Sequence, residues 1–193
     1  MDTPLDPKTV FTPFPTLETP RLILRALRMD DLDDLYEYAS DPELARYTSW
    51  DHYRSLDEAR ADLAEFVAQY ESERLSIPGM GDWGIEHRAD RKLIGICNFT
   101  YWRVRHRRAE IGYAISRRYW GQGLAVEAAQ AMIAFGFRQM DLVRIEATCL
   151  PENMPSQRVM QKLGMQREGV LRSYEVWRGE PKDLVMYALV RDA

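Results

Sequence analysis

The sequence predicts one mixed α/β (α+β) domain: a largely antiparallel sheet with a central parallel strand pair, flanked by helices. Three observations support this fold class. Hairpin-like strand pairs lie in the first and last parts of the chain. Between them, a strand (109–115), a helix (124–137) and a strand (144–150) follow in the order of a right-handed crossover, which makes two strands parallel. The 193 residues, 46% of them apolar, suffice for one core.

The N-terminal part is predicted to be an extended arm followed by a strand and a helix. Residues 1–16 are rich in proline, so we expect an arm there and a single domain over residues 17–193. Leu22–Leu27 has the pattern of a strand. Asp30 is the expected N-cap of a helix that ends at Asp41-Pro42, because the residue before proline disfavours helical geometry.

A second helix and a hairpin follow. Ser55 and Glu58 have the spacing of a capping box, and the apolar residues from Ala59 to Tyr70 share one helical face. Residues 83–86 and 93–99 flank the turn RADRK and predict an antiparallel hairpin.

After the predicted crossover, the chain closes with a short helix and two strands. The helix runs from about Pro155 to Leu163 and stops at Gly164, a typical C-cap. Residues 170–177 and 184–190 are predicted strands around the turn RGEPKD.

Composition excludes several functional classes. A net charge of −4 with scattered basic residues argues against nucleic-acid binding, and no apolar stretch approaches the ~20 residues of a membrane span. Cys97 and Cys149 lie in apolar strand-like runs, which favours reduced thiols in the cytoplasm. The N-terminus lacks the layout of a secretory signal. No histidine or cysteine cluster has metal-ligand spacing, so we expect no metal.

The stretch RRYWGQGLAVEAAQAM joins the strand 109–115 to the helix that begins near Leu124. Backbone N–H groups and the helix dipole favour an anion at such a turn, and Gly121 and Gly123 have no Cβ to keep it away. Two alternatives remain open at this point. The glycines merely allow a tight turn with solvated arginines, or they begin a dinucleotide-binding motif, which Val126 at the third glycine position disfavours.

From about Thr19 to the C-terminus, the chain resembles the GNAT superfamily of acetyl-CoA-dependent N-acetyltransferases. More narrowly it resembles the RimJ/RimL type, which acetylates the α-amino end of ribosomal proteins. The stretches that carry the resemblance are ETPRLILR, GDWGI, LIGICNF, AEIGYAI, RRYWGQGLAVEAAQAM and NMPSQRVMQKLGM. The resemblance implies a GNAT-like fold whose parallel strand pair splays apart, with acetyl-CoA as the co-substrate and its pyrophosphate as the anion.

The resemblance also implies which residues bind acetyl-CoA. The end of the strand 109–115 would bond to the pantetheine amides, and the glycine turn would hold the pyrophosphate. These residues are Tyr113, Ala114, Ile115, Arg117, Arg118, Trp120, Gly121, Gln122, Gly123, Leu124 and Ala125. Asn153 is a further expected pantetheine contact, or a helix cap, or both.

Three residues match catalytic positions of the family. Ser156 would contact the cofactor and assist its leaving thiolate, unless it caps backbone amides. Glu175 and Glu110 are alternative general bases, and of the two we favour Glu175. Glu175 is otherwise an exposed strand residue, and Glu110 is otherwise paired with an arginine such as Arg108 or Arg144. Cys149, without a triad partner, is expected to be a packed thiol.

The expected reaction is direct transfer of acetyl to a primary amine in a ternary complex. We favour a protein N-terminal α-amino group, whose pKa near 8 leaves about a tenth neutral at pH 7. The alternatives are a small-molecule amine and a non-catalytic acyl-CoA-binding module. The basic cluster RVRHRR is a solvated loop, or it binds the 3′-phosphate of coenzyme A or an acidic acceptor. Relatives of this kind are often dimers, so we expect a homodimer. The aromatic candidates for the acceptor slot are Tyr47, Trp50, Tyr53, Trp102, Tyr174 and Trp177.

Overall fold

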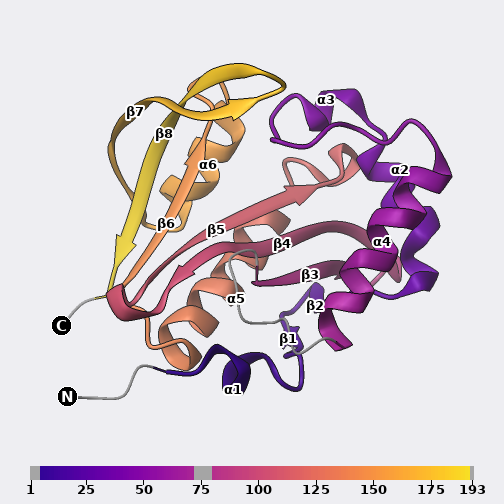
Figure 1. Cartoon of the computed structure of the whole chain (residues 1–193), viewed down its shortest axis with the longest axis horizontal. Helices are drawn as coiled ribbons and strands as arrows, with labels where there is room; N and C mark the ends of the chain where they lie inside the picture. The colour runs from indigo at the N-terminus through magenta and orange to yellow at the C-terminus, as the bar shows by residue number, and fades with distance from the viewer. Residues whose placement is uncertain (1–4, 72–79, 192–193) are drawn as a thin grey trace.

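The structure, a computed structural model, describes residues 5–71 and 80–191. These residues form an eight-stranded sheet in the order β1-β2-β3-β4-β5-β6-β8-β7 (Figure 1). Within them, β5 and β6 are the one parallel pair, and every other neighbouring pair is antiparallel. The strands are β1 (Leu17–Glu18), β2 (Leu22–Ala26), β3 (Met80–His87), β4 (Lys92–Arg103), β5 (Arg108–Ile115), β6 (Arg144–Cys149), β7 (Gln166–Trp177) and β8 (Glu180–Val190).

Helices cover both faces of the sheet, and each face has its own apolar core. The helices are α1 (Pro7–Phe11), α2 (Leu32–Ala39), α3 (Pro42–Ala45), α4 (Leu56–Glu71), α5 (Leu124–Gln139) and α6 (Met154–Lys162). Residues of α1, α5 and α6 share one buried cluster with the sheet, whereas α2, α3 and α4 share another. The predicted fold class is therefore confirmed.

The parallel pair separates soon after it begins. Its register comprises three pairs, of which Ala109↔Ile145 is the middle one and Glu110↔Glu146 is the last. Beyond Glu110, β5 continues to Ile115 while β6 runs to Cys149 without pairing with it. Figure 1 shows the two strands diverging from a common end. The backbone edge of β5 that faces β6 therefore has no strand partner over residues 111–115.

A buried charge cluster holds the strands together where the separation begins. Glu146 is 1% exposed and accepts hydrogen bonds from Arg108 on β5, from Arg144 on β6 and from the Tyr101 hydroxyl on β4. Burial opposes ionisation of Glu146, but these three donors hold the pKa of its carboxyl below the usual value.

The N-terminal arm is not merely extended as predicted. Asp6 caps a short helix by accepting a hydrogen bond from the Lys8 amide, and Pro7 occupies the first helical position. Phe11 is fully buried and lies 5.8 Å from Trp83 between ring centroids. The prolines predicted an extended arm, and local sequence did not show the burial of Phe11 because that burial depends on distant parts of the chain. Residues 1–4 lie outside the described range.

Element boundaries account for the other differences. The N-cap of α2 is Asp31, not Asp30, because a 3₁₀ turn (Met29–Asp31) precedes the helix. Asp41 caps a further short helix, α3, through the Glu43 amide. The predicted basic connection is partly strand, since β4 extends through Arg103, and β8 already begins at Glu180. The predicted cap at Ser55 and the other helices and strands are confirmed.

Candidate active site

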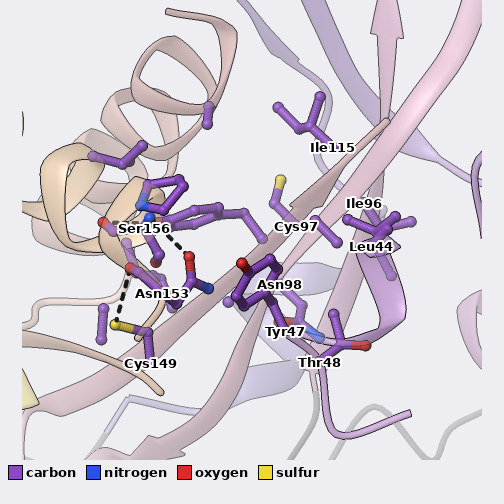
Figure 2. Close-up of a pocket in the computed structure, with 18 of the residues that line it drawn as sticks. Leu44, Tyr47, Thr48, Ile96, Cys97, Asn98, Ile115, Cys149, Asn153 and Ser156 are labelled. Atoms are coloured by element: carbon purple, nitrogen blue, oxygen red, sulfur yellow. Dashed lines mark hydrogen bonds between the residues drawn. The ribbon is translucent and has the colours of Figure 1, made fainter. Parts of the chain in front are cut away.

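A cavity of about 820 Å³ lies where β5 and β6 separate. It reaches from the glycine turn at the start of α5 to the segment 44–50 around α3. Figure 2 shows Asn153 and Ser156 of the α6 region on one side of this cavity, and Leu44, Tyr47 and Thr48 on the other. The cavity therefore joins the predicted cofactor site to the predicted acceptor slot.

The glycine turn has the backbone geometry that its sequence predicts. Gly121 and Gly123 have φ angles of 77° and 79°, in the left-handed region that favours glycine. Gly123 is the N-cap of α5, so the first N–H groups of this helix have no acceptor within it. A Cβ at Gly121 would meet no atom within 4 Å. The turn therefore offers an open surface of amides, which suits a diphosphate.

An ion pair that the sequence analysis missed braces this turn. Arg21 donates from Nε and from its backbone N–H to the Glu127 carboxylate, at 2.6 and 2.8 Å, and its Nη1 donates to the Gln122 carbonyl at 2.9 Å. Thr19 donates a further bond of 2.7 Å to Glu127. Burial works against ionisation, but these donors keep the pKa of Glu127 below its usual value. The sequence signal for this pair was the stretch ETPRLILR, which contains Thr19 and Arg21. It contributed to the resemblance, but neither residue was assigned a role.

The two arginines before the turn are paired with carboxylates. Arg117 Nε lies 2.7 Å from Asp41 Oδ2, and Arg118 donates to Glu37. Neither arginine lines the cavity, and neither does Gln122, so their contact with acetyl-CoA stays a prediction. Among the other predicted cofactor residues, Tyr113, Ala114, Ile115, Trp120, Gly121, Gly123, Leu124, Ala125, Asn153 and Ser156 all line it.

Ser156 is held by a tyrosine hydroxyl. Its Oγ lies 3.0 Å from the hydroxyl oxygen of Tyr113. Ser156 does not cap α6, because Asn153 does so by accepting from the Ser156 amide at 3.1 Å. Burial raises the pKa of Tyr113, so its hydroxyl is neutral at physiological pH. The resemblance implied a role only for the backbone of Tyr113, and nothing in the local sequence pairs two residues so far apart.

Cys149 is a buried thiol in the wall of the cavity, as predicted. It is 5% exposed and unpaired, and its Sγ lies 3.9 Å from the Asn153 carbonyl (Figure 2). Burial raises the pKa of this thiol to about 11, so it is protonated at neutral pH and a poor nucleophile.

Glu110 projects into the cavity where the strands part. It is 7% exposed, and its two oxygens accept from Thr148 at 2.6 Å and from Thr100 at 3.0 Å. Burial raises its pKa, the two hydroxyls work against this, and the negative charge of Glu175 adds to the rise. The alternative in which Glu110 pairs with an arginine is wrong for Arg108 and Arg144, because both pair with Glu146.

Glu175 reaches the same cavity from β7. It is an exposed strand residue, which was the alternative to its role as general base, and its Oε2 accepts a hydrogen bond from the Trp177 indole N–H at 2.6 Å. Glu110 and Glu175 thus bring two carboxylates to the cavity, one fixed and buried, the other open to solvent.

The aromatic candidates divide into two groups. Tyr47, Trp50 and Trp177 line the cavity. Tyr53 and Trp102 pack against the two cores instead, and Tyr174 is 48% exposed outside the cavity.

The basic cluster lies far from the glycine turn, at the opposite end of β5. This eight-residue strand spans about 25 Å. Arg107 there pairs with Asp141 at 2.7 Å. This position and this ion pair favour the alternative in which the cluster is solvated over binding of the 3′-phosphate of coenzyme A.

Residues 5–71 and 80–191 contain no group of three or more His, Cys, Asp or Glu arranged to hold a metal ion. This part of the chain also contains no helix with the length and apolar character of a membrane span.

Comparison with known proteins identifies the family. Residues 21–166 match the model described as "Acetyltransferase (GNAT) domain". The chain is 38% identical to "Uncharacterized N-acetyltransferase YoaA" of Bacillus subtilis, covering 92% of this chain and 98% of that protein. It is 32% identical to the "[Ribosomal protein uS5]-alanine N-acetyltransferase" of Escherichia coli, over about half of each chain.

Solved structures agree with this assignment. A GNAT-family acetyltransferase from Bacillus anthracis superposes with a TM-score of 0.78 at 30% identity, covering 91% of this chain and 98% of that one. A RimL ribosomal L7/L12 α-N-protein acetyltransferase in complex with coenzyme A has a TM-score of 0.77 at 22% identity, covering 93% and 99%, and supports the fold alone. The open glycine turn, the unpaired edge of β5 and the cavity between them fit acetyl-CoA. The chain belongs to the GNAT acetyltransferase family and is an acetyl-CoA-dependent N-acetyltransferase.

Proposed function

We propose that this enzyme acetylates the α-amino group of a protein N-terminus, by direct attack in a ternary complex. Bound acetyl-CoA supplies the activated acetyl thioester. The observation that carries the proposal is the continuous cavity, which joins the amide-lined turn at Gly121 and Gly123 to two carboxylates, Glu110 and Glu175. Its acceptor end is open to solvent at Glu175, as a polypeptide end requires.

Glu110 is the proposed general base. Its raised pKa makes it a stronger proton acceptor than an ordinary carboxylate, and the two threonine hydroxyls fix its orientation. It takes the proton that the amine loses while nitrogen attacks the thioester carbon. Glu175, which the sequence alone favours as the base, is proposed to attract the protonated amine to the cavity mouth and to pass protons to solvent. An α-amine is the suitable acceptor, because lysine costs roughly 3 kcal/mol more to deprotonate.

Ser156 is proposed to donate a hydrogen bond to the leaving sulfur as the carbon–sulfur bond breaks. The Tyr113 hydroxyl, 3.0 Å away, orients the serine hydroxyl. Asn153 and the amides at the start of α5 hold the pantetheine and pyrophosphate, as the resemblance implies. We further propose a homodimer, which light scattering would support by giving the mass of two 22.5-kDa chains and contradict by giving one.

A peptide panel tests the acceptor class. The panel contains peptides with a free α-amine and no lysine, peptides with a blocked α-amine and one lysine, and peptides with a free α-amine and one lysine. Thiol release measures the rate of transfer, and mass spectrometry identifies the acetylated amine. We expect acetyl only on α-amines. Acetylation confined to lysine, or to small amines offered in parallel, would overturn the protein N-terminus as acceptor.

A further inference from the structure

A second buried carboxylate, Asp82, lines the same cavity on the acceptor side of the sheet. It is 8% exposed and accepts a hydrogen bond of 2.7 Å from Asn98 Nδ2 on β4. Asn98 in turn stands opposite Gly112 of β5, where an added Cβ would lie 2.8 Å from Asn98 Oδ1. A polar pair therefore joins β3 and β4, and the missing side chain of Gly112 on β5 makes room for Asn98.

The charge of Asp82 is not balanced by the described part of the chain. No lysine, arginine or histidine in residues 5–71 and 80–191 forms an ion pair with it, and one hydrogen bond, from a neutral amide, is all its carboxylate accepts from their side chains. Burial raises the pKa of Asp82 to about 6, against the opposing effect of Asn98. About nine-tenths of the group is still ionised at pH 7. A buried carboxylate without a cation destabilises the empty protein, so its position in a cavity points to a ligand.

The surroundings of Asp82 suit a positive charge. Tyr47, Trp50 and Phe66 line the same end of the cavity, and aromatic faces attract cations. Asp82 on β3 and Glu110 on β5 are two strand spacings apart, about 10 Å, and are also offset by about two residues, roughly 7 Å, along the strands, which puts their backbone positions about 12 Å apart. One ammonium group cannot contact both carboxylates at that separation.

We propose that Asp82 and Asn98 form a second acceptor subsite, which binds a positively charged group beside the amine that is acetylated. This inference rests on the proposed acetyl transfer to an amine. The ligand chemistry is a primary amine with a second positive charge on the order of 6–12 Å away, given the separation of Asp82 and Glu110. Two sources offer it: a polypeptide whose second residue is lysine or arginine, and a small aliphatic diamine.

Matched acceptor pairs test the subsite and distinguish its sources. One pair is a peptide with Lys as its second residue, its side-chain amine trimethylated to keep the charge, against the same peptide with Gln. The other pair is 1,4-diaminobutane against 4-amino-1-butanol. We expect kcat/KM to be about 10-fold higher for the charged member of at least one pair. A preference for the charged peptide identifies a polypeptide as the acceptor. A preference for 1,4-diaminobutane over 4-amino-1-butanol identifies a small diamine.

Asp82→Asn removes the charge and keeps the shape, so it should reduce the preference for the charged member of each pair to within about 2-fold. Asp33→Asn, an exposed carboxylate on α2, is the control and should keep the preference. Equal rates in both wild-type pairs, or an undiminished preference in Asp82→Asn, would overturn the proposal, and the wild-type pairs decide even if the variant does not fold.

A binding measurement separates this inference from the proposed function. Calorimetry with 1,4-diaminobutane and with the Gln and trimethyl-Lys peptides, on enzyme without acetyl-CoA, measures the subsite directly. If the enzyme acetylates none of these acceptors but binds the charged members more tightly, the proposed function fails and the subsite stands. If it acetylates them all without discrimination and binds charged and neutral members equally, the subsite fails and the function stands.

Discussion

Replacing Gly123 with alanine isolates the contribution of the glycine turn to cofactor binding. The φ angle of Gly123 is 79°, and alanine in the left-handed region costs roughly 1–2 kcal/mol. For a domain of this size the melting temperature should fall by about 2–8 °C. A Cβ at this position would find no obstacle nearer than Arg21 Nη2, at 3.7 Å, so strain alone accounts for the stability loss. The same methyl group stands on the surface that the pyrophosphate is proposed to occupy.

The expected effect on affinity is larger than the effect on stability. Loss of one charge-assisted hydrogen bond to the pyrophosphate costs about 1.5–3 kcal/mol, which is roughly a 10- to 150-fold rise in the Kd for acetyl-CoA. Calorimetric titration with acetyl-CoA measures this.

Gly164→Ala is the matched control. Its φ angle is 78°, a Cβ there also meets nothing within 4 Å, and the residue follows α6 outside the cavity. It should lose the same stability and keep the wild-type affinity. Equal affinities in all three proteins, or equal losses in both variants, would refute the assignment of the phosphate site.

Other residues give further predictions. Tyr113→Phe should lower kcat by about 10-fold or more and leave the KM for acetyl-CoA unchanged, because it frees the Ser156 hydroxyl without removing a cofactor contact; an unchanged kcat argues against the pair. Glu110→Gln should remove the rise of kcat with pH, whereas a retained pH profile would exclude it as the base. Glu127→Gln should destabilise the protein at pH 7. The folded-state pKa of Glu127 is lowered, so its contribution is present above the unfolded pKa and lost as pH falls through the folded one. Denaturant titrations should therefore give different stabilities for the two proteins at pH 7, and this difference should disappear as pH falls below the unfolded value of about 4.3. Equal stabilities at pH 7 would contradict the pairing of Arg21 with this carboxylate. Phe11→Ala should cost about 3–5 kcal/mol of unfolding free energy, whereas a cost below about 1 kcal/mol would indicate a loosely attached arm.

The sequence predicted the elements whose signals are local. Alternating and helical periodicities gave the strands and helices, and the glycine spacing gave the positive-φ turn at Gly121 and Gly123. The resemblance then supplied the splayed strand pair, which no local pattern contains. The residues along the edge of β5 and at the start of α5 were predicted to bind the cofactor, from the glycine spacing and from the resemblance.

Pairings between distant side chains were not predictable in this way. The bond between Tyr113 and Ser156 and the bond between Arg21 and Glu127 each join separate elements, and they depend on strand register and helix packing. Phe11 was missed as a core residue for the same reason, because its burial is decided by Trp83 and other distant residues.

The proposed reaction requires the pyrophosphate to bind the amides at the start of α5 and the pantetheine to lie along the free edge of β5. A crystal structure of the acetyl-CoA complex would show both contacts. We expect phosphate oxygens within hydrogen-bond distance of amides in residues 121–125, and the thioester sulfur beside Ser156. Acetyl-CoA bound elsewhere, with the gap between β5 and β6 filled by side chains, would refute this placement of the cofactor.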